Sequence, residues 1–161
     1  MPTKKFLKML KKQDYQIFLF SCPAIIPFNV FFDHSWFVCV KNGKVSRWEV
    51  LFHNNKKNIA AGKHLHCNTL EAFSGASMTP FFLDKILWKA KLIKYIEGPE
   101  NSLAHKMYEF IENSDKNYKY KNNYWPTGPN CNTYIQWILN HFPEFNINLS
   151  WRFIGKNYKI L

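Results

Sequence analysis

Three stretches of the chain have the apolar content of β-strands. Tyr15–Phe20 has the pattern of a short buried strand, and Asn29–Val40 and Val45–Phe52 are rich in Val, Phe and Trp. The last two stretches are joined by a linker whose Asn42-Gly43 dipeptide is typical of a tight type I′ turn. The pattern therefore predicts an antiparallel hairpin over residues 29–52.

The two-residue turn also predicts the register of this hairpin. The expected cross-strand pairs are Lys41 with Lys44, Val38 with Arg47, Trp36 with Glu49 and His34 with Leu51. Because opposite residues and alternate residues share a face, one side of the sheet should carry His34, Trp36, Glu49, Leu51 and His53. Glu49 and His53 are then the diagonal neighbours of His34, within reach of its imidazole.

The clearest helical pattern follows a Pro/Gly-rich loop in residues 124–142. The apolar residues fall at the i, i+3, i+4, i+7 positions of one helix face, namely Ile135, Ile138, Leu139 and Phe142. Asn130 is a favoured N-cap residue, and Pro143 ends the pattern. Cys131 falls in the first turn, on the same inward face as the apolar stripe.

Further elements are predicted outside the hairpin and this helix. Lys91–Ile96 alternates polar and apolar residues and ends at a Gly-Pro dipeptide, which indicates a strand. Ser102–Glu112 is predicted as a helix, and a shorter helix is expected from Thr79 or Pro80 to Lys89. Residues 53–78 are otherwise expected to form an exposed loop, residues 113–123 a polar loop, and residues 146–161 a tail that packs on the domain.

These elements predict an α+β fold. We expect an antiparallel sheet around the 29–52 hairpin, with helices packed on one side and the Cys131 helix central. Residues 1–13 form a basic lead, and residues 14–161 have a suitable length for a single domain. A hydrophobic content of 47% and an aromatic content of 18% exclude a disordered chain.

The charge of the chain points to anionic partners. A net charge of +11 raises nucleic acid and an anionic membrane surface as partner classes. Only Arg47 and Arg152 offer the guanidinium fork that binds phosphates and base edges well, and all other cations are lysines. We therefore interpret the charge mainly as a contribution to solubility and keep nucleic-acid binding as the minority hypothesis.

The first residues of the chain and its apolar runs indicate whether the protein is exported or inserted into a membrane. No stretch approaches the ~20 apolar residues of a membrane-spanning helix. The lysine-rich start and the run Ile17–Phe20 have the order of a signal or lipoprotein sequence, but Asp14 and Gln16 make the apolar run too short. The expectation is a cytoplasmic protein.

The four cysteines give neither a disulfide framework nor a zinc site. Cys22, Cys39, Cys67 and Cys131 are widely spaced and contain no C-x-x-C pair, so reduced thiols are expected. The run His64, His66, Cys67 is the alternative for a metal, but no fourth ligand follows it. We expect neither a metal nor a cofactor.

Cys131 is the strongest candidate for a chemically reactive residue. A thiol in the first turn of a helix faces unpaired N–H groups and the positive end of the helix dipole, which favour the thiolate. His34, with Glu49 or His53 to orient it, could supply the base. The alternatives are a cysteine that only packs, a strand-end histidine bonded to backbone or water, and a Glu49 that pairs with Arg47 or a lysine.

Three stretches together resemble a known family. DHSWFVCVKNGKVSRWEV, YWPTGPNCNTYIQWIL and FIGKNY are similar, in this order, to the bacterial DUF3750 domain, which has no assigned activity. Asn157 stands where that family's pattern has Asp, Thr127 is inserted in the spacing of the middle motif, and some members carry serine at the position of Cys131.

A second, more distant resemblance is to the circularly permuted NlpC/P60 and lecithin retinol acyltransferase-like proteins. It rests on the order of a histidine strand, a partner strand and an Asn-Cys helix start. It implies a papain-like fold in which Cys131 is the nucleophile, His34 the base, and Glu49 or His53 the orienting group.

Two functions of different classes follow from these residues. The first is a thiol hydrolase or acyltransferase acting on an amide or ester, with an oxyanion held by the Cys131 N–H and the side chain of Asn130 or Asn132. Trp36, Tyr124 and Trp125 would then line the acyl pocket. The second is a non-catalytic binding domain whose groove takes a peptide, a lipid or an anionic partner. The sequence names neither the small-molecule, peptide or lipid substrate nor the oligomeric state.

Overall fold

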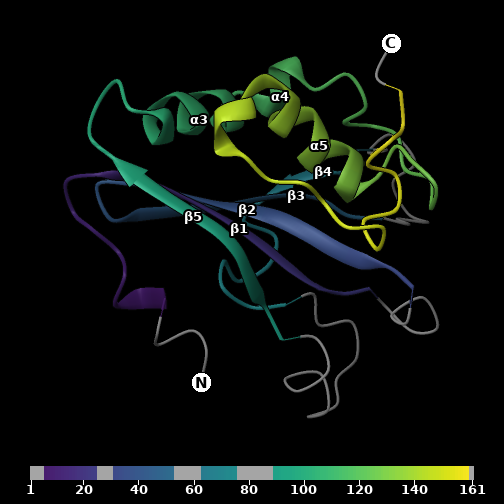
Figure 1. Cartoon of the computed structure of the whole chain (residues 1–161), viewed down its shortest axis with the longest axis horizontal. Helices are drawn as coiled ribbons and strands as arrows, with labels where there is room; N and C mark the ends of the chain where they lie inside the picture. Colours follow the sequence, from purple (N-terminus) through teal and green to yellow (C-terminus); the bar gives the residue numbers. More distant parts are fainter. Residues whose placement is uncertain (1–5, 25–30, 53–62, 76–88, 160–161) are drawn as a thin grey trace.

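A five-stranded antiparallel sheet forms the centre of the fold (Figure 1). The computed structural model describes residues 6–24, 31–52, 63–75 and 89–159. The strands, in the spatial order β4-β3-β2-β1-β5, are β1 (Tyr15–Pro23), β2 (Asp33–Lys41), β3 (Lys44–Val50), β4 (Leu65–Cys67) and β5 (Lys91–Gly98). The predicted α+β class with an antiparallel sheet is confirmed.

The β2–β3 hairpin has the predicted turn and register near its tip. Asn42 and Gly43 have φ angles of 53° and 74°, as a type I′ turn requires, and the pairs Lys41↔Lys44 and Val38↔Arg47 are present. The ladder ends at Phe37↔Trp48, so the two outer predicted pairs, of Trp36 and of His34, fall beyond it. There β3 continues along β4, with Glu49 paired to His66.

Three helices cover one face of the sheet, as predicted (Figure 1). They are α3 (Leu103–Glu112), α4 (Ser114–Asn117) and α5 (Cys131–His141), followed by the short 3₁₀ helix η2 (Pro143–Phe145). Met107 and Ile138 belong to the same buried cluster as Ile17, Leu19 and Phe37 of the sheet. No helix in the described residues has the length and apolar content needed to cross a bilayer.

The opposite face of the sheet is covered too. Phe18, Phe20 and Trp36 form a second buried cluster there, together with Phe6 from the N-terminal turn and Phe73 from the segment after β4. With both faces covered, β1 is buried from Gln16 to Cys22 without alternation. This accounts for the continuous apolar run of that strand.

Two of the loop predictions are wrong. The 53–78 loop contains the edge strand β4, whose three residues are too few to show an alternating pattern, and the 113–123 loop contains α4. Tyr118, at the end of α4, is buried against the rings of Tyr134 and Trp137. The helix predicted to end at Lys89 lies largely outside the described residues.

Candidate functional site

The N-terminus of α5 is held by a complete capping box, and this cap was predicted from Asn130. The side-chain oxygen of Asn130 accepts the N–H groups of Asn132 (3.0 Å) and Thr133 (3.2 Å), and the Thr133 hydroxyl accepts the Asn130 N–H (3.1 Å). Cys131 is the first residue of the helix, where the backbone N–H groups are unpaired by the helix itself. The cap fixes Cys131 at the positive end of the helix.

The two asparagines beside Cys131 use their amide groups to tie the helix to other segments. The Asn130 amide donates to the carbonyls of Pro126 (2.9 Å) and Ile154 (3.1 Å). Asn132 donates to Asp33 (3.0 Å) and also to Ile154 (3.0 Å). Both side chains are therefore occupied by structural hydrogen bonds.

The contacts of Asn132 bring Cys131 next to His34. Asn132 donates to the Asp33 carbonyl and accepts the hydroxyl of Ser35 (2.6 Å), so it binds both residues that flank His34 on β2. Cys131, the preceding residue, and His34 lie at this junction of α5 with β2, close enough for Cys131 to raise the pKa of the imidazole. Two of the residues predicted to act together are thus neighbours in space.

His34 is also bound to Glu49, as the hairpin register predicts. The imidazole Nε2 lies 2.8 Å from Glu49 Oε2, and the two side chains are almost completely buried. Arg47 donates to the same carboxylate oxygen from Nη2 (2.7 Å). Its Nε lies 2.7 Å from Oε1, at ion-pair distance but without the alignment of a hydrogen bond. The carboxylate is therefore shared between an imidazole and a guanidinium.

Arg47 is itself held in place by three further contacts. Its guanidinium lies over the ring of Trp36, 4.2 Å from the centroid. Its Nη1 donates to the carbonyls of Glu71 (2.7 Å) and Ser74 (2.6 Å). A buried cation needs such partners, because an unpaired charge inside a protein is costly. Arg47 thus fixes the orientation of the Glu49 carboxylate, and Glu49 in turn fixes that of the His34 imidazole.

The surroundings shift the pKa values of both members of the His34–Glu49 pair. Burial alone lowers the pKa of His34, but the charge and hydrogen bond of a Cys131 thiolate, together with Glu49, outweigh burial and raise it well above its usual range. Burial raises the pKa of Glu49, but His34 first and Arg47 second outweigh that effect and lower it. The site favours a protonated imidazole beside a carboxylate.

We expect Cys131→Ala to lower the pKa of His34. Without the thiolate, only Glu49 opposes the loss of solvation that disfavours the imidazolium. NMR titration of the imidazole signals would measure this pKa, with His34→Gln to assign the signal and Cys67→Ala as the control cysteine. An unchanged His34 pKa in Cys131→Ala would show that the two side chains are not coupled.

The raised pKa of His34 also sets the sign of a stability effect. Since the folded-state value lies above the unfolded one, the stabilisation is fully present below about pH 6.5 and is lost as the pH rises through the folded value. The difference in unfolding free energy between wild type and His34→Gln should therefore shrink with increasing pH.

The remaining candidate residues differ in how deeply they are buried. Trp36 is completely buried, its ring centroid 5.7 Å from that of His34, and its N–H donates to the Ala72 carbonyl (3.0 Å). Tyr124 is half-buried against Phe52. Trp125 is mostly exposed. His53 lies outside the described residues.

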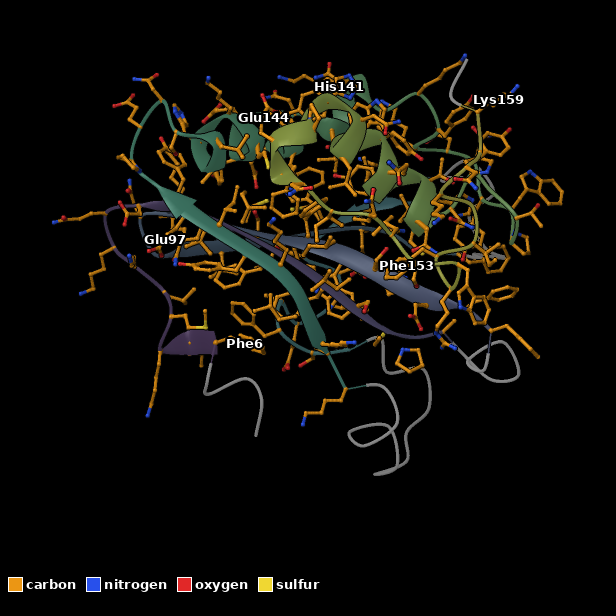
Figure 2. All side chains as sticks on the ribbon, viewed as in Figure 1. Phe6, Glu97, His141, Glu144, Phe153 and Lys159 are labelled. Atoms are coloured by element: carbon orange, nitrogen blue, oxygen red, sulfur yellow. The ribbon has the colours of Figure 1, made fainter. Side chains whose placement is uncertain are left out.

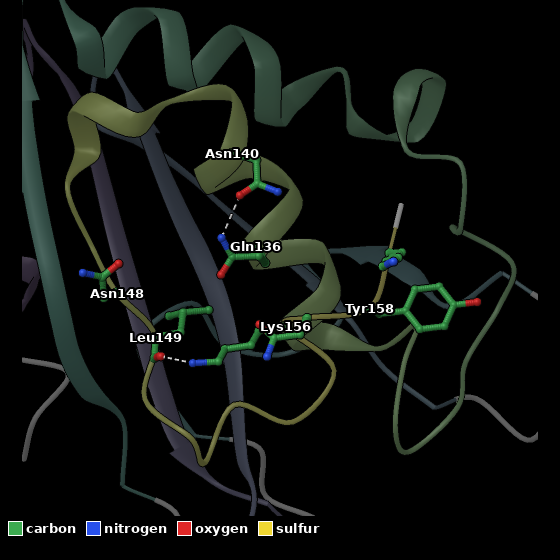
Figure 3. A pocket seen from close by; sticks show the side chains of 8 residues that line it. Gln136, Asn140, Asn148, Leu149, Lys156 and Tyr158 are labelled. Atoms are coloured by element: carbon green, nitrogen blue, oxygen red, sulfur yellow. Dashed lines mark hydrogen bonds between the residues drawn. The ribbon is translucent and has the colours of Figure 1, made fainter. Parts of the chain in front are cut away.

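A pocket of about 620 Å³ lies between α5 and the C-terminal segment (Figure 3). Its polar lining comes from α5 and the C-terminal segment and includes Gln136, Asn140, Asn148 and Lys156. Neither Cys131 nor His34 contributes to its lining. The pocket and the cysteine–histidine junction are therefore separate features.

The described residues hold no group of three or more His, Cys, Asp or Glu side chains arranged for a metal ion. His64, one of the alternatives from the sequence, directs Nδ1 to the Leu51 carbonyl at 3.1 Å. Cys67 is exposed on β4.

Two residues of the site have roles that the sequence analysis did not anticipate. Arg47 appeared only as an alternative partner of Glu49, although both residues share a face because they are two apart on β3. The Ser35 hydroxyl, which binds Asn132, was not considered at all. Ser35 directly follows His34 on β2, but its partner is 97 residues away and has no local signal.

Of the comparisons with known proteins, only the one with protein-family models finds a match. No curated protein matches it, and no solved structure does. A model of the family described as a protein of unknown function, DUF3750, matches residues 14–158, which include β1, the His34–Glu49 hairpin, α5 and the segment that holds its cap. The chain therefore belongs to the DUF3750 family.

Proposed function

We propose that the protein is a thiol hydrolase or acyltransferase that acts on an amide or ester, with Cys131 as the nucleophile. The observation that carries this proposal is the position of His34 between Cys131, at the capped start of α5, and the buried carboxylate of Glu49. A cysteine nucleophile needs a base within reach and a third group that orients this base. Cys131, His34 and Glu49 supply these three parts.

The arrangement assigns a separate task to each ring nitrogen. Because Nε2 of His34 binds Glu49, Nδ1 is the nitrogen that would take the proton of the Cys131 thiol. The thiolate attacks the substrate carbonyl, and the tetrahedral intermediate expels the amine or alkoxide, which receives the proton from His34. Water, or an acceptor hydroxyl or amine, then gives a proton to His34 as it attacks the acyl-cysteine, and the C–S bond breaks to release the acyl product and the Cys131 thiolate.

Stabilisation of the oxyanion falls to the backbone in this mechanism. The amide hydrogens of Asn130 and Asn132 are all bound to carbonyls, so these side chains act as supports. The Cys131 N–H, at the first position of α5, is the donor left beside the reacting carbonyl.

The order of the elements supports a finer statement about the frame. A histidine strand, a partner strand with the orienting residue, and a later helix that begins with Asn-Cys follow the order of the permuted NlpC/P60-like proteins. We propose that the sheet and α5 form a circularly permuted papain-like frame. This part of the proposal rests on the order of elements and on the three site residues.

The pH dependence of iodoacetamide alkylation of Cys131 tests the proposal. We expect iodoacetamide to alkylate Cys131 readily at neutral pH in wild type and much more slowly in His34→Ala, because the thiolate is the reactive form and the imidazole promotes it. Peptide mapping separates Cys131 from the other cysteines without further substitutions. Cys67 on β4, whose pKa is raised to about 11 chiefly by partial burial of its thiol, is an internal control in the same sample.

Two results would contradict the enzyme. One is a Cys131 that reacts with the same pH dependence in wild type and in His34→Ala. The other is a Cys131 that is not alkylated in either protein. Either would favour the second candidate function, a non-catalytic binding domain on the same frame, which agrees with the low exposure of Cys131, at 5%.

A further inference from the structure

Most of the large apolar side chains that remain exposed belong to segments that adjoin the N-terminus of α5. In the described part of the chain six are exposed, and Leu7 belongs to the N-terminal turn. The other five are aromatic and come from four separate segments; we call them the aromatic rim: Phe31, Phe52, Trp125, Trp151 and Tyr158.

The first half of the rim is attached to the start of β2. Phe31 precedes Asp33, whose N–H donates to the carbonyl of Arg152 (3.0 Å), next to Trp151. The Asp33 carboxylate accepts the Arg152 guanidinium (2.8 Å). Because Asn132 of α5 also binds the Asp33 carbonyl, the segments that carry Phe31 and Trp151 lie beside the N-terminus of α5.

The second half belongs to the loop that precedes α5. The ring of Phe52, just after β3, lies 5.5 Å from that of Tyr124, and Trp125 follows. The Tyr158 side chain lies against Gly128, so closely that a Cβ on that glycine would be 2.8 Å from the tyrosine Cβ. Both halves of the rim therefore adjoin the segment that leads into Cys131.

The exposure of the rim is unusual for a face in water. Trp125 and Trp151 are 65% and 66% exposed, and Phe52 is 61% exposed. Single exposed apolar residues are ordinary, but a cluster rimmed by polar residues marks an interaction surface.

The chain around the rim is cationic. Residues 118–133 and 150–159 contain Lys119, Lys121, Arg152, Lys156 and Lys159 and no acidic residue. Figure 2 shows Phe153 and Lys159 at the end of the molecule opposite to Glu97. The surface that exposes the aromatic rings thus also carries excess positive charge.

The nearby carboxylates are already paired, among them Asp115, which lies 2.6 Å from the Lys63 ammonium. Asp33 is paired with Arg152, and Glu49 is buried with Arg47. Both arginines of the chain are thereby engaged, which leaves lysines as the cations that face outward.

We propose that the aromatic rim docks on an anionic lipid bilayer. Trp and Tyr favour the membrane–water interface, Phe adds buried apolar area, and each lysine near the surface attracts anionic headgroups. Nucleic acid is the less suitable partner, because its phosphates and base edges are best bound by free guanidinium groups. Docking does not depend on the reaction proposed for Cys131, and it places that residue at the bilayer surface.

Co-sedimentation with vesicles tests the docking surface. We expect the full chain to sediment with vesicles of phosphatidylcholine and phosphatidylglycerol and much less with phosphatidylcholine alone. Trp125→Ser with Trp151→Ser should weaken binding by about tenfold or more, since two large apolar contacts are lost. Leu7→Ser, an exposed apolar residue outside the rim, is the matched control and should bind as wild type.

A second pair of variants tests the charge. Lys119→Gln with Lys159→Gln should weaken binding and its dependence on salt, whereas Lys44→Gln with Lys106→Gln, away from the rim, should not. Equal binding by rim variants and controls would overturn the proposal. So would absence of vesicle binding, equal affinity for the two vesicle types, or retention on a single-stranded oligonucleotide without vesicle binding.

Discussion

Replacing Glu49 by glutamine is expected to lower the free energy of unfolding by about 3–5 kcal/mol. The glutamine oxygen can take the place of Oε2, which now accepts both donors, but the amide group in the place of Oε1 turns an N–H toward the Arg47 Nε. Arg47, which is completely buried, then lacks its counter-ion. Urea unfolding at neutral pH measures the loss.

Glu109→Gln on α3 is the matched control for this substitution. Glu109 pairs with Lys41 at 3.6 Å, and both side chains are largely in water, so its loss should leave the unfolding midpoint nearly unchanged. If Glu49→Gln behaves like Glu109→Gln, the carboxylate does not hold the site together.

The effect of Glu49→Gln should also depend on pH. The pKa of Glu49 is lowered in the folded protein, so its stabilisation is present above the ordinary glutamate value of about 4.3 and is lost as the pH falls through the folded value. Wild type and variant should therefore converge in stability in acid.

Asn130→Ala is expected to destabilise the protein by about 2–4 kcal/mol. The variant loses the N-cap of α5, worth about 1–2 kcal/mol, and the two hydrogen bonds from its amide to the Pro126 and Ile154 carbonyls, each worth about 1 kcal/mol. Thermal or urea unfolding measures the loss. Asn140→Ala, which removes an exposed side-chain bond to Gln136 on the same helix, should have little effect.

Asn130→Asp separates the two roles of Asn130. The carboxylate keeps the cap of α5 but cannot donate to Pro126 and Ile154. Its stability should lie between those of wild type and Asn130→Ala. A value equal to that of Asn130→Ala would show that the ties to the loops, and not the cap, account for the whole effect.

The parts of the fold with strong local signals were predictable. Asn42-Gly43 specified the turn and hence the pairs near the hairpin tip, and Asn130 with the apolar stripe specified the start of α5. The contact of His34 with Glu49 followed from that same register, although the ladder itself ends one pair earlier. Short-range rules thus placed His34 and Glu49 correctly relative to each other.

The parts that depend on distant contacts were not predictable. β4 has three residues, and its pairing with β3 becomes visible only in the folded sheet. The amides of Asn130 and Asn132 were available donors in the sequence, and only the structure shows that loop carbonyls occupy them. Tyr118 was assigned to a polar loop because the rings that bury it belong to α5.

The hydrogen bonds between the start of α5 and the segment around Gly155 have a consequence for biosynthesis. The carbonyls of Ile154 and Gly155 accept Asn130, Asn132 and Thr133, and a Cβ at Gly155 would lie 2.5 Å from the Asn130 amide. Since a ribosome makes α5 before this segment, the nascent chain carries Cys131 on a helix whose cap is not yet locked. The geometry of the thiol is completed only after the ribosome has passed Gly155.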